Sequence, residues 1–102
     1  MISVQDSIVV LTNTVPLPYD NVKVILTKKL DDDVYGECSV NTKTESIIIR
    51  IRSTAPLVAQ VDALIHEWAH GMLALLEEEF EKHGPLWGVC YARCYSMIYS
   101  SL

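Results

Sequence analysis

Residues 57–79, LVAQVDALIHEWAHGMLALLEEE, decide the fold of this chain. The stretch has no proline and consists mostly of helix-forming residues. Its apolar side chains recur at helical spacing and form one broad surface, made of Leu57, Val61, Leu64, Ile65, Trp68, Met72, Leu75 and Leu76. Just before it, Ser53 and Thr54 can cap a helix, and Pro56 is tolerated in a first turn. We therefore predict a central helix from Leu57 to about Glu79, buried against a sheet.

Three segments that precede this helix favour strands, at residues 22–30, 35–40 and 46–52. The last, SIIIRIR, alternates most clearly and places Ile47, Ile49 and Ile51 on one dry face. The polar residues between the second and third segments suit a hairpin connection. We expect a three-stranded, mainly antiparallel sheet in meander order. Residues 1–20 lack clean periodicity, and we expect an extended N-terminal segment there.

The breaker Gly84-Pro85 marks the start of a second helix, predicted from Pro85 to about Tyr99. At 102 residues the chain has room for one core and no independent second module. The sequence therefore predicts a single α+β domain over residues 1–102: a small zincin-like fold, in which the sheet packs on the central helix and a C-terminal helix follows.

Composition narrows the function classes. Eight Lys and Arg residues against 13 Asp and Glu residues give a net charge of −5, which opposes autonomous binding to nucleic acid. No apolar run could span a membrane, and the start of the chain does not resemble a secretory signal, so we expect a cytoplasmic protein. Three cysteines without a CxxC pair favour buried free thiols at Cys38, Cys90 and Cys94. The oligomeric state stays open.

The central helix contains the candidate metal-binding and catalytic residues, which form the HExxH motif from His66 to His70. Histidines four residues apart lie about 40° apart around a helix and one turn apart along it, so both imidazoles can reach one metal ion. Glu67 lies roughly 60° from His70 around the same helix and flanks the ion. That is the position of a general base that acts on a water molecule at the metal.

A catalytic zinc site normally has three protein ligands and one open position, so a third ligand is required. The remaining histidine, His83, follows His70 by 13 residues and would lie roughly 20 Å away if the helix continued straight. It can bind only if the helix stops and the chain turns back, which Gly84 permits. The competing donors for this position are acidic residues of the same stretch: Glu77, Glu78, Glu79 and Glu81.

Four stretches together, YGECS, IIIRI, LIHEWAHGM and HGPLWG, resemble the SprT-like zinc metallopeptidases of the zincin group. The resemblance covers about residues 20 to 99. It implies that His66, His70 and His83 bind one Zn²⁺ per chain, that Glu67 is the catalytic base, and that the substrate is a protein or peptide. Unlike family members that act on proteins bound to DNA, this acidic chain has neither a zinc ribbon nor a basic DNA-binding region.

Other residues are candidates for supporting roles. Tyr91, Arg93 and Tyr95 on the second helix could stabilise an oxyanion, or could simply pack or lie at the surface. Asp62, one turn before His66, could orient that imidazole. Trp68 and Trp87 are expected in the core, with Trp87 beneath the turn at His83.

Two classes of function fit these features. The first is a zinc-dependent metallopeptidase, with another zinc hydrolase such as an amidase as a variant of the same chemistry. The alternative is a zinc-stabilised, non-catalytic protein-binding module that uses a sheet edge to hold its partner. Glu67 favours the enzyme, because a purely structural zinc site needs no carboxylate beside an open coordination position.

Overall fold

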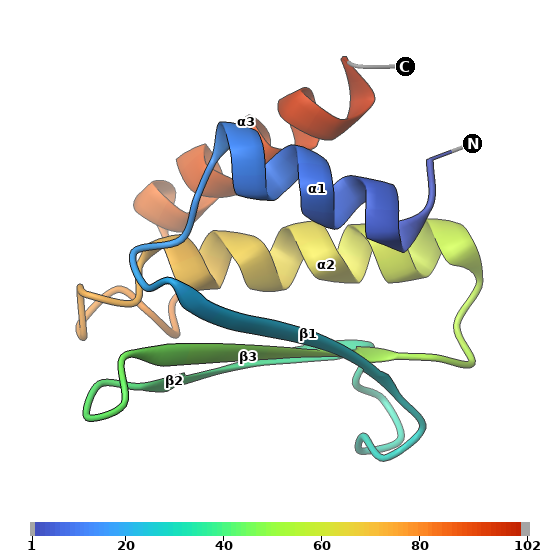
Figure 1. The fold of residues 1–102 in the computed structure, drawn as a ribbon, viewed down its shortest axis with the longest axis horizontal. Helices are drawn as coiled ribbons and strands as arrows, with labels where there is room; N and C mark the ends of the chain where they lie inside the picture. Colours follow the sequence, from blue (N-terminus) through green and yellow to red (C-terminus); the bar gives the residue numbers. More distant parts are fainter. Residues whose placement is uncertain (1, 101–102) are drawn as a thin grey trace.

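The computed structural model describes residues 2–100 and contains three helices and three strands within that range (Figure 1). In chain order these are α1 (Val4–Thr14), β1 (Asn21–Thr27), β2 (Gly36–Asn41), β3 (Ser46–Arg52), α2 (Leu57–Met72) and α3 (Pro85–Tyr99). The predicted α+β class is therefore confirmed, as are the three strand regions and the second helix.

The order of the strands differs from the prediction. The sheet runs β1-β3-β2, with β3 parallel to β1 and antiparallel to β2, so the expected meander is wrong and the sheet is mixed. The cause is the apolar content of β3, whose Ile47, Ile49 and Ile51 are all 0% exposed. The strand with the driest face occupies the centre, where both neighbours shield it. β1 and β2 are then the two edges of the sheet.

The N-terminal segment is a helix where we expected an extended chain. Ser3 caps α1, because its hydroxyl accepts a hydrogen bond of 3.0 Å from the Asp6 backbone N–H. Val4, Ser7 and Leu11 are buried at helical spacing against the rest of the core. The many β-branched residues of α1 obscured this periodicity, and burial against α2 and α3 overrides their weak helix propensity.

The central helix is shorter than predicted, since α2 ends at Met72 and does not reach Glu79. Leu73 caps it by donating its N–H to the carbonyls of His70 and Gly71, and a series of turns follows through residues 73–81. Acidic residues interact unfavourably with the C-terminal end of a helix dipole, which is consistent with an early end before the run at 77–79. This reversal brings the chain back toward α2.

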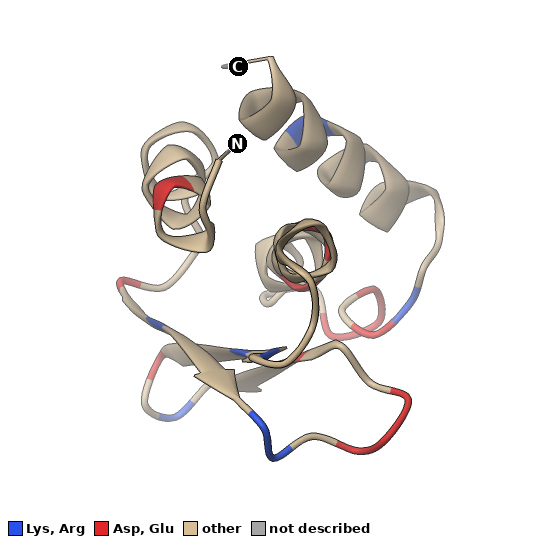
Figure 2. Ribbon diagram, turned by 90° about the vertical axis from the view of Figure 1, so that its right-hand side faces the viewer, with Lys and Arg blue, Asp and Glu red and all other residues tan. Residues whose placement is uncertain are grey.

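The helices all lie on one face of the sheet, and α2 lies between the sheet and the α1–α3 pair (Figures 1 and 2). Trp68 is 2% exposed in this core, as predicted, and its indole Nε1–H donates to the carbonyl of Val15 over 2.8 Å. This bond ties the end of α1 to α2. Cys90 and Cys94 are buried free thiols, and Cys38 is partly buried.

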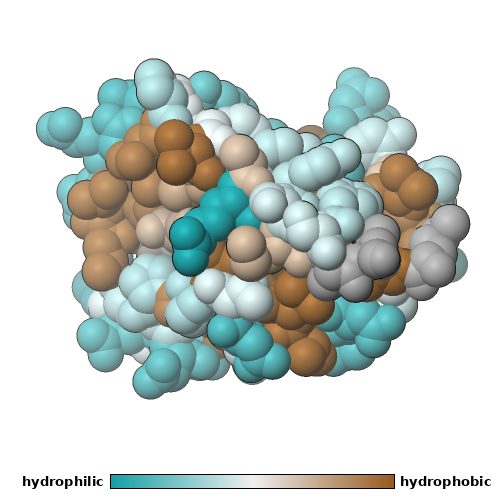
Figure 3. Space-filling model, turned by 90° about the horizontal axis from the view of Figure 1, so that it is seen from above, coloured by the Kyte–Doolittle hydropathy of each residue, from teal (hydrophilic) through white to brown (hydrophobic). Residues whose placement is uncertain are grey.

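Not all apolar side chains are in the core. Seen from the helical side, apolar side chains gather at the surface toward one end of the molecule (Figure 3). The exposed large apolar residues of the α2–α3 connection and the first turns of α3 are Leu75, Leu76, Leu86 and Val89. Across the described part of the chain, none of the helices has the length and apolar content required to cross a membrane.

Candidate metal centre

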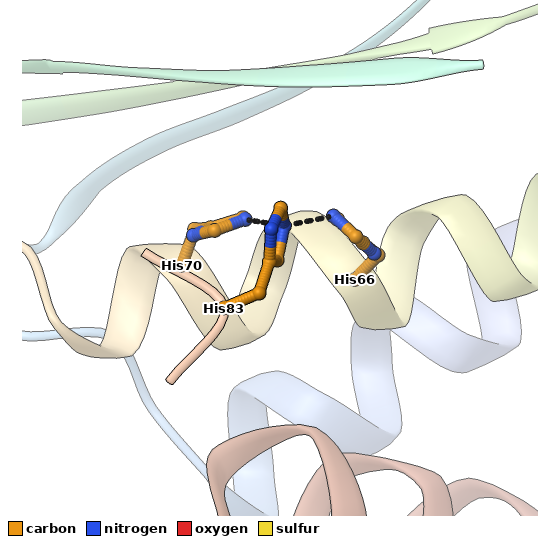
Figure 4. A group of neighbouring side chains, drawn as sticks. All are labelled: His66, His70 and His83. Carbon is orange, nitrogen blue, oxygen red and sulfur yellow. Dashed lines mark hydrogen bonds between the residues drawn. The ribbon is translucent and has the colours of Figure 1, made fainter. Parts of the chain in front are cut away.

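Three imidazole rings converge on one point beside α2 (Figure 4). His66 and His70 come from α2, and His83 comes from the connection that precedes α3. The Nε2 atom of His83 lies 3.1 Å from Nε2 of His70 and 3.1 Å from Nε2 of His66. Among the described residues this is the one group of three potential ligands close enough to hold a metal ion, with all ligand atoms within 4.8 Å of one another.

The hydrogen bonds of these rings direct their Nε2 atoms toward a common point. The Nδ1–H of His70 donates to the carbonyl of Phe80 over 2.7 Å, and a carbonyl can only accept. Nε2 of neutral His70 therefore presents a lone pair to His83. A neutral His83 can offer at most one Nε2–H for its two contacts of 3.1 Å with His66 and His70, and this single proton cannot point straight at both acceptors. A cation held between the rings would be shared by the lone pairs of all three Nε2 atoms.

Two of the three spacings between the Nε2 atoms are compatible with a tetrahedral metal ion such as zinc. Two nitrogens bound to one tetrahedral zinc ion at about 2.0–2.1 Å lie about 3.3–3.4 Å apart. The two contacts of 3.1 Å are within a few tenths of an ångström of that value. Burial, as the largest cause, lowers the pKa of both His66 and His70. The neutral imidazole is the form that binds metals, so burial prepares these two side chains as ligands.

The position of His83 depends on the reversal after α2 and on Trp87. The chain turns through hydrogen bonds from Leu76 N–H to Leu73 O and from Phe80 N–H to Leu76 O. Trp87, in the first turn of α3, packs its ring against all three histidines, with centroid separations of 4.8–5.7 Å. Trp87 thus lies beneath the His83 turn, as the sequence predicted.

Glu67 lies beside the three histidines without joining them. It is 8% exposed, and its Oε2 atom is 4.0 Å from Nε2 of His66, beyond hydrogen-bond distance. Burial raises the pKa of Glu67 to about 7, with a further contribution from the negative charge of Glu37 on β2. The carboxyl group lines a cavity of about 250 Å³ together with the three histidines, so it can reach a molecule held there.

Other predicted candidates have different roles in the structure. Asp62 accepts a hydrogen bond of 2.6 Å from the Tyr91 hydroxyl, and its carboxylate makes no hydrogen bond to His66. Arg93 and Tyr95 lie exposed on α3. The acidic residues that compete for the third ligand position are outside the ligand cluster: Glu77, Glu78, Glu79 and Glu81.

Two groups at the site were missed by the sequence analysis. The first is the main-chain carbonyl of Phe80, which fixes the tautomer of His70 and which no side-chain pattern could reveal. The second is Gly36, at the start of β2, which also lines the cavity. A glycine at the start of a predicted strand could have indicated a close approach of another element.

A three-histidine cluster with an adjacent buried carboxyl group can bind a divalent cation and exchange protons with a molecule at its open side. Comparisons of the chain with protein-family models, with curated proteins and with solved structures gave no match.

Proposed function

We propose that this protein is a zinc-dependent metallopeptidase, similar to the SprT-like enzymes, that hydrolyses peptide bonds with Glu67 as general base. One observation carries the proposal: Glu67, a buried carboxyl group, faces the same cavity as the three clustered histidines. A site that held zinc only for stability would have no use for this group. The order of the motifs in the sequence, HExxH followed by HGPLW, supports the same conclusion.

When bound, zinc supplies a Lewis acid that polarises a carbonyl group and lowers the pKa of water at its open position. His66, His70 and His83 would hold the ion, and the carbonyl of Phe80 keeps His70 in the tautomer that presents Nε2. Glu67 takes a proton from the attacking water and later delivers it to the leaving amine. Its raised pKa, about 7, suits transfer in both directions near neutral pH.

The substrate would lie along β2. This strand is an edge of the sheet, so its outer backbone groups are free of strand partners, and Gly36, Glu37 and Cys38 line the cavity at the histidines. An extended peptide can add to such an edge through main-chain hydrogen bonds. The isoleucine-rich strand β3 is central, which leaves β2 as the edge beside the site.

The test combines metal analysis with hydrolysis of an unbiased peptide library. We expect about one zinc ion per chain in the parent and in Glu67→Gln, and a loss of kcat/KM of at least about 100-fold in the variant, the usual scale of general-base catalysis. Glu78→Gln, an exposed position, is the matched control and should retain parental activity. A Glu67→Gln protein as active as the parent would rule out this mechanism.

The free edge of β2 also favours a second candidate, a zinc-stabilised module that binds a protein partner by strand addition. It predicts zinc binding without hydrolysis of any library member. Under that outcome Glu67→Gln would bind the partner as well as the parent does.

A further inference from the structure

A second cavity adjoins the candidate metal centre. It has a volume of about 480 Å³ and lies between α2 and the loop that joins β1 to β2. His66 and Glu67 line both this cavity and the one at the three histidines, so the two spaces are adjacent at these side chains. A peptide bound along β2 would therefore place a neighbouring side chain at the mouth of this second cavity.

The walls of this cavity carry three carboxyl groups, from Asp33, Asp62 and Glu67, and no lysine or arginine. Figure 2 shows the acidic loop on one side of α2. The guanidinium group of Arg52 is occupied elsewhere, because it donates to main-chain carbonyls of Leu30, Asp31, Asp32 and Val34. Arg52 thus holds the loop in place through the loop's main chain and forms no ion pair with the carboxylates of the described loop residues.

The carboxyl group of Glu67 is also accessible from this second cavity. Its side chain lines the cavity at 8% exposure and accepts no hydrogen bond from any described residue. The carboxyl oxygens of Glu67 are not fully enclosed, so they can accept a hydrogen bond from a donor that enters the cavity. Asp33 likewise has no hydrogen bond or ion pair within the described residues, and one oxygen of Asp62 remains available beside the bond from Tyr91.

The geometry argues against a second metal ion in this cavity. Within the described part of the chain, the only group with ligand atoms close enough for a metal is the histidine cluster. The carboxylates of Asp33, Asp62 and Glu67 are spread over the wall. Such an arrangement suits a long, flexible cationic side chain that can approach one or two of them.

We propose that this cavity is a specificity subsite for a lysine or arginine side chain of the peptide substrate, next to the bond that is cleaved. This inference rests on the proposed peptidase function. The aliphatic stem would pack on Ala59 and Ala63, which also line the space, and the charged end would reach Asp33 and Asp62. Tyr35, which is 55% exposed, also lines the cavity, and an aromatic ring at this place can contact the same cation.

Binding is tested separately from cleavage. The probes are octapeptides of alanine with one central lysine, arginine, norleucine or glutamate, titrated into zinc-loaded Glu67→Gln protein and followed by ¹H–¹⁵N NMR. We expect the lysine and arginine peptides to bind about three- to fivefold more tightly than the norleucine peptide, the upper range for a partly exposed charge pair. The shifts should include the amides of residues 33–36, and high salt should reduce the preference.

The same titrations on variants locate the subsite. Asp33→Asn combined with Asp62→Asn should bring the lysine and norleucine peptides within twofold of each other; asparagine at position 62 can still accept the bond from Tyr91. Asp32→Asn removes a neighbouring exposed charge that does not line the cavity, and it should keep the preference. Equal affinities for all four peptides, or a preference that survives the double substitution, would overturn the proposal.

Cleavage assays with the parent separate this inference from the proposed function. Hydrolysis of the norleucine peptide as efficiently as the lysine peptide overturns the subsite and leaves the peptidase standing. If the peptides bind with a charge-dependent preference but none is hydrolysed, the proposed subsite for a cationic side chain stands and the proposed peptidase function is rejected.

Discussion

Gly36 of β2 lies so close to Glu67 of α2 that a Cβ atom at position 36 would meet Cγ of Glu67 at 3.1 Å. The same Cβ would lie 3.3 Å from the carbonyl oxygen of Arg50 and 3.4 Å from Cβ of Ala63. The strand cannot withdraw from α2 because it pairs along its length with β3. Gly36 therefore sets how closely the sheet approaches the carboxyl group on which the proposed chemistry depends.

Substituting Gly36→Ala should displace the side chain of Glu67 and leave the histidines in place. We expect kcat/KM for peptide hydrolysis to fall by about tenfold or more, since small misplacements of a catalytic group are costly. The zinc content should stay at one ion per chain. Steady-state kinetics and metal analysis of the same preparation would check both expectations.

Gly88→Ala is the matched control for this substitution. It lies within α3, and a Cβ there would meet nothing within 4 Å. Alanine is favoured over glycine in a helix interior by about 0.5–1 kcal/mol, so this variant should gain stability and keep its activity. Loss of activity in both glycine variants would contradict the role assigned to Gly36.

His83→Ala should weaken zinc binding by at least about 100-fold, because it removes one of three ligands, and even the loss of an outer-shell partner typically weakens binding 10–100-fold. The neighbouring Lys82→Ala changes an exposed side chain outside the cluster and should bind zinc as the parent does. Competition with a chromophoric chelator measures both affinities. Parental affinity in His83→Ala would show that His83 does not bind the metal.

The candidate site was more predictable than the fold around it. The spacing of His66 and His70 is set by helix geometry alone, and a single remaining histidine next to Gly84-Pro85 left few routes to a third ligand. The exact path by which the chain turns back from the end of α2 to His83 was not predictable, because it depends on turns through residues 73–81 and on the carbonyl of Phe80. These are main-chain interactions that carry no sequence pattern.

The errors in the fold arose where long-range packing decides the outcome. The positions of the strands follow from the local alternation of side chains along the sequence. The central place of β3 depends instead on a comparison of all three strands, because the strand with the most apolar buried face takes the centre. The helix α1 forms because Val4, Ser7 and Leu11 are buried against other elements. Its sequence, rich in valine and threonine, has a low intrinsic helix propensity.

The bond between Trp68 and Val15 makes the docking of the N-terminal helix testable. Trp68→Phe keeps an aromatic ring in the core but leaves the carbonyl of Val15 without its donor. We expect a loss of about 1–3 kcal/mol in the free energy of unfolding, measured by urea denaturation, with little change in zinc affinity. A stability equal to the parent would mean that water reaches this carbonyl.

Cys94 should make the stability of the fold sensitive to alkaline pH. Its side chain is 0% exposed, and burial raises the pKa of the thiol from 9.0 to about 12. The folded state therefore retains a proton that the unfolded chain releases above pH 9. The contribution to stability is complete below pH 9 and is lost as the pH rises toward 12.

One retained proton gives a slope of at most about 1.4 kcal/mol per pH unit. Urea denaturation at several values between pH 8 and 10.5 should show this decline in the parent and a shallower one in Cys94→Ala. The comparison isolates Cys94 from the other groups with raised pKa values, which are Cys38, Cys90, Tyr91 and Tyr99. Identical slopes for the two proteins would show that the Cys94 thiol ionises as readily in the folded state as in the unfolded chain, in conflict with its burial on the inner face of α3.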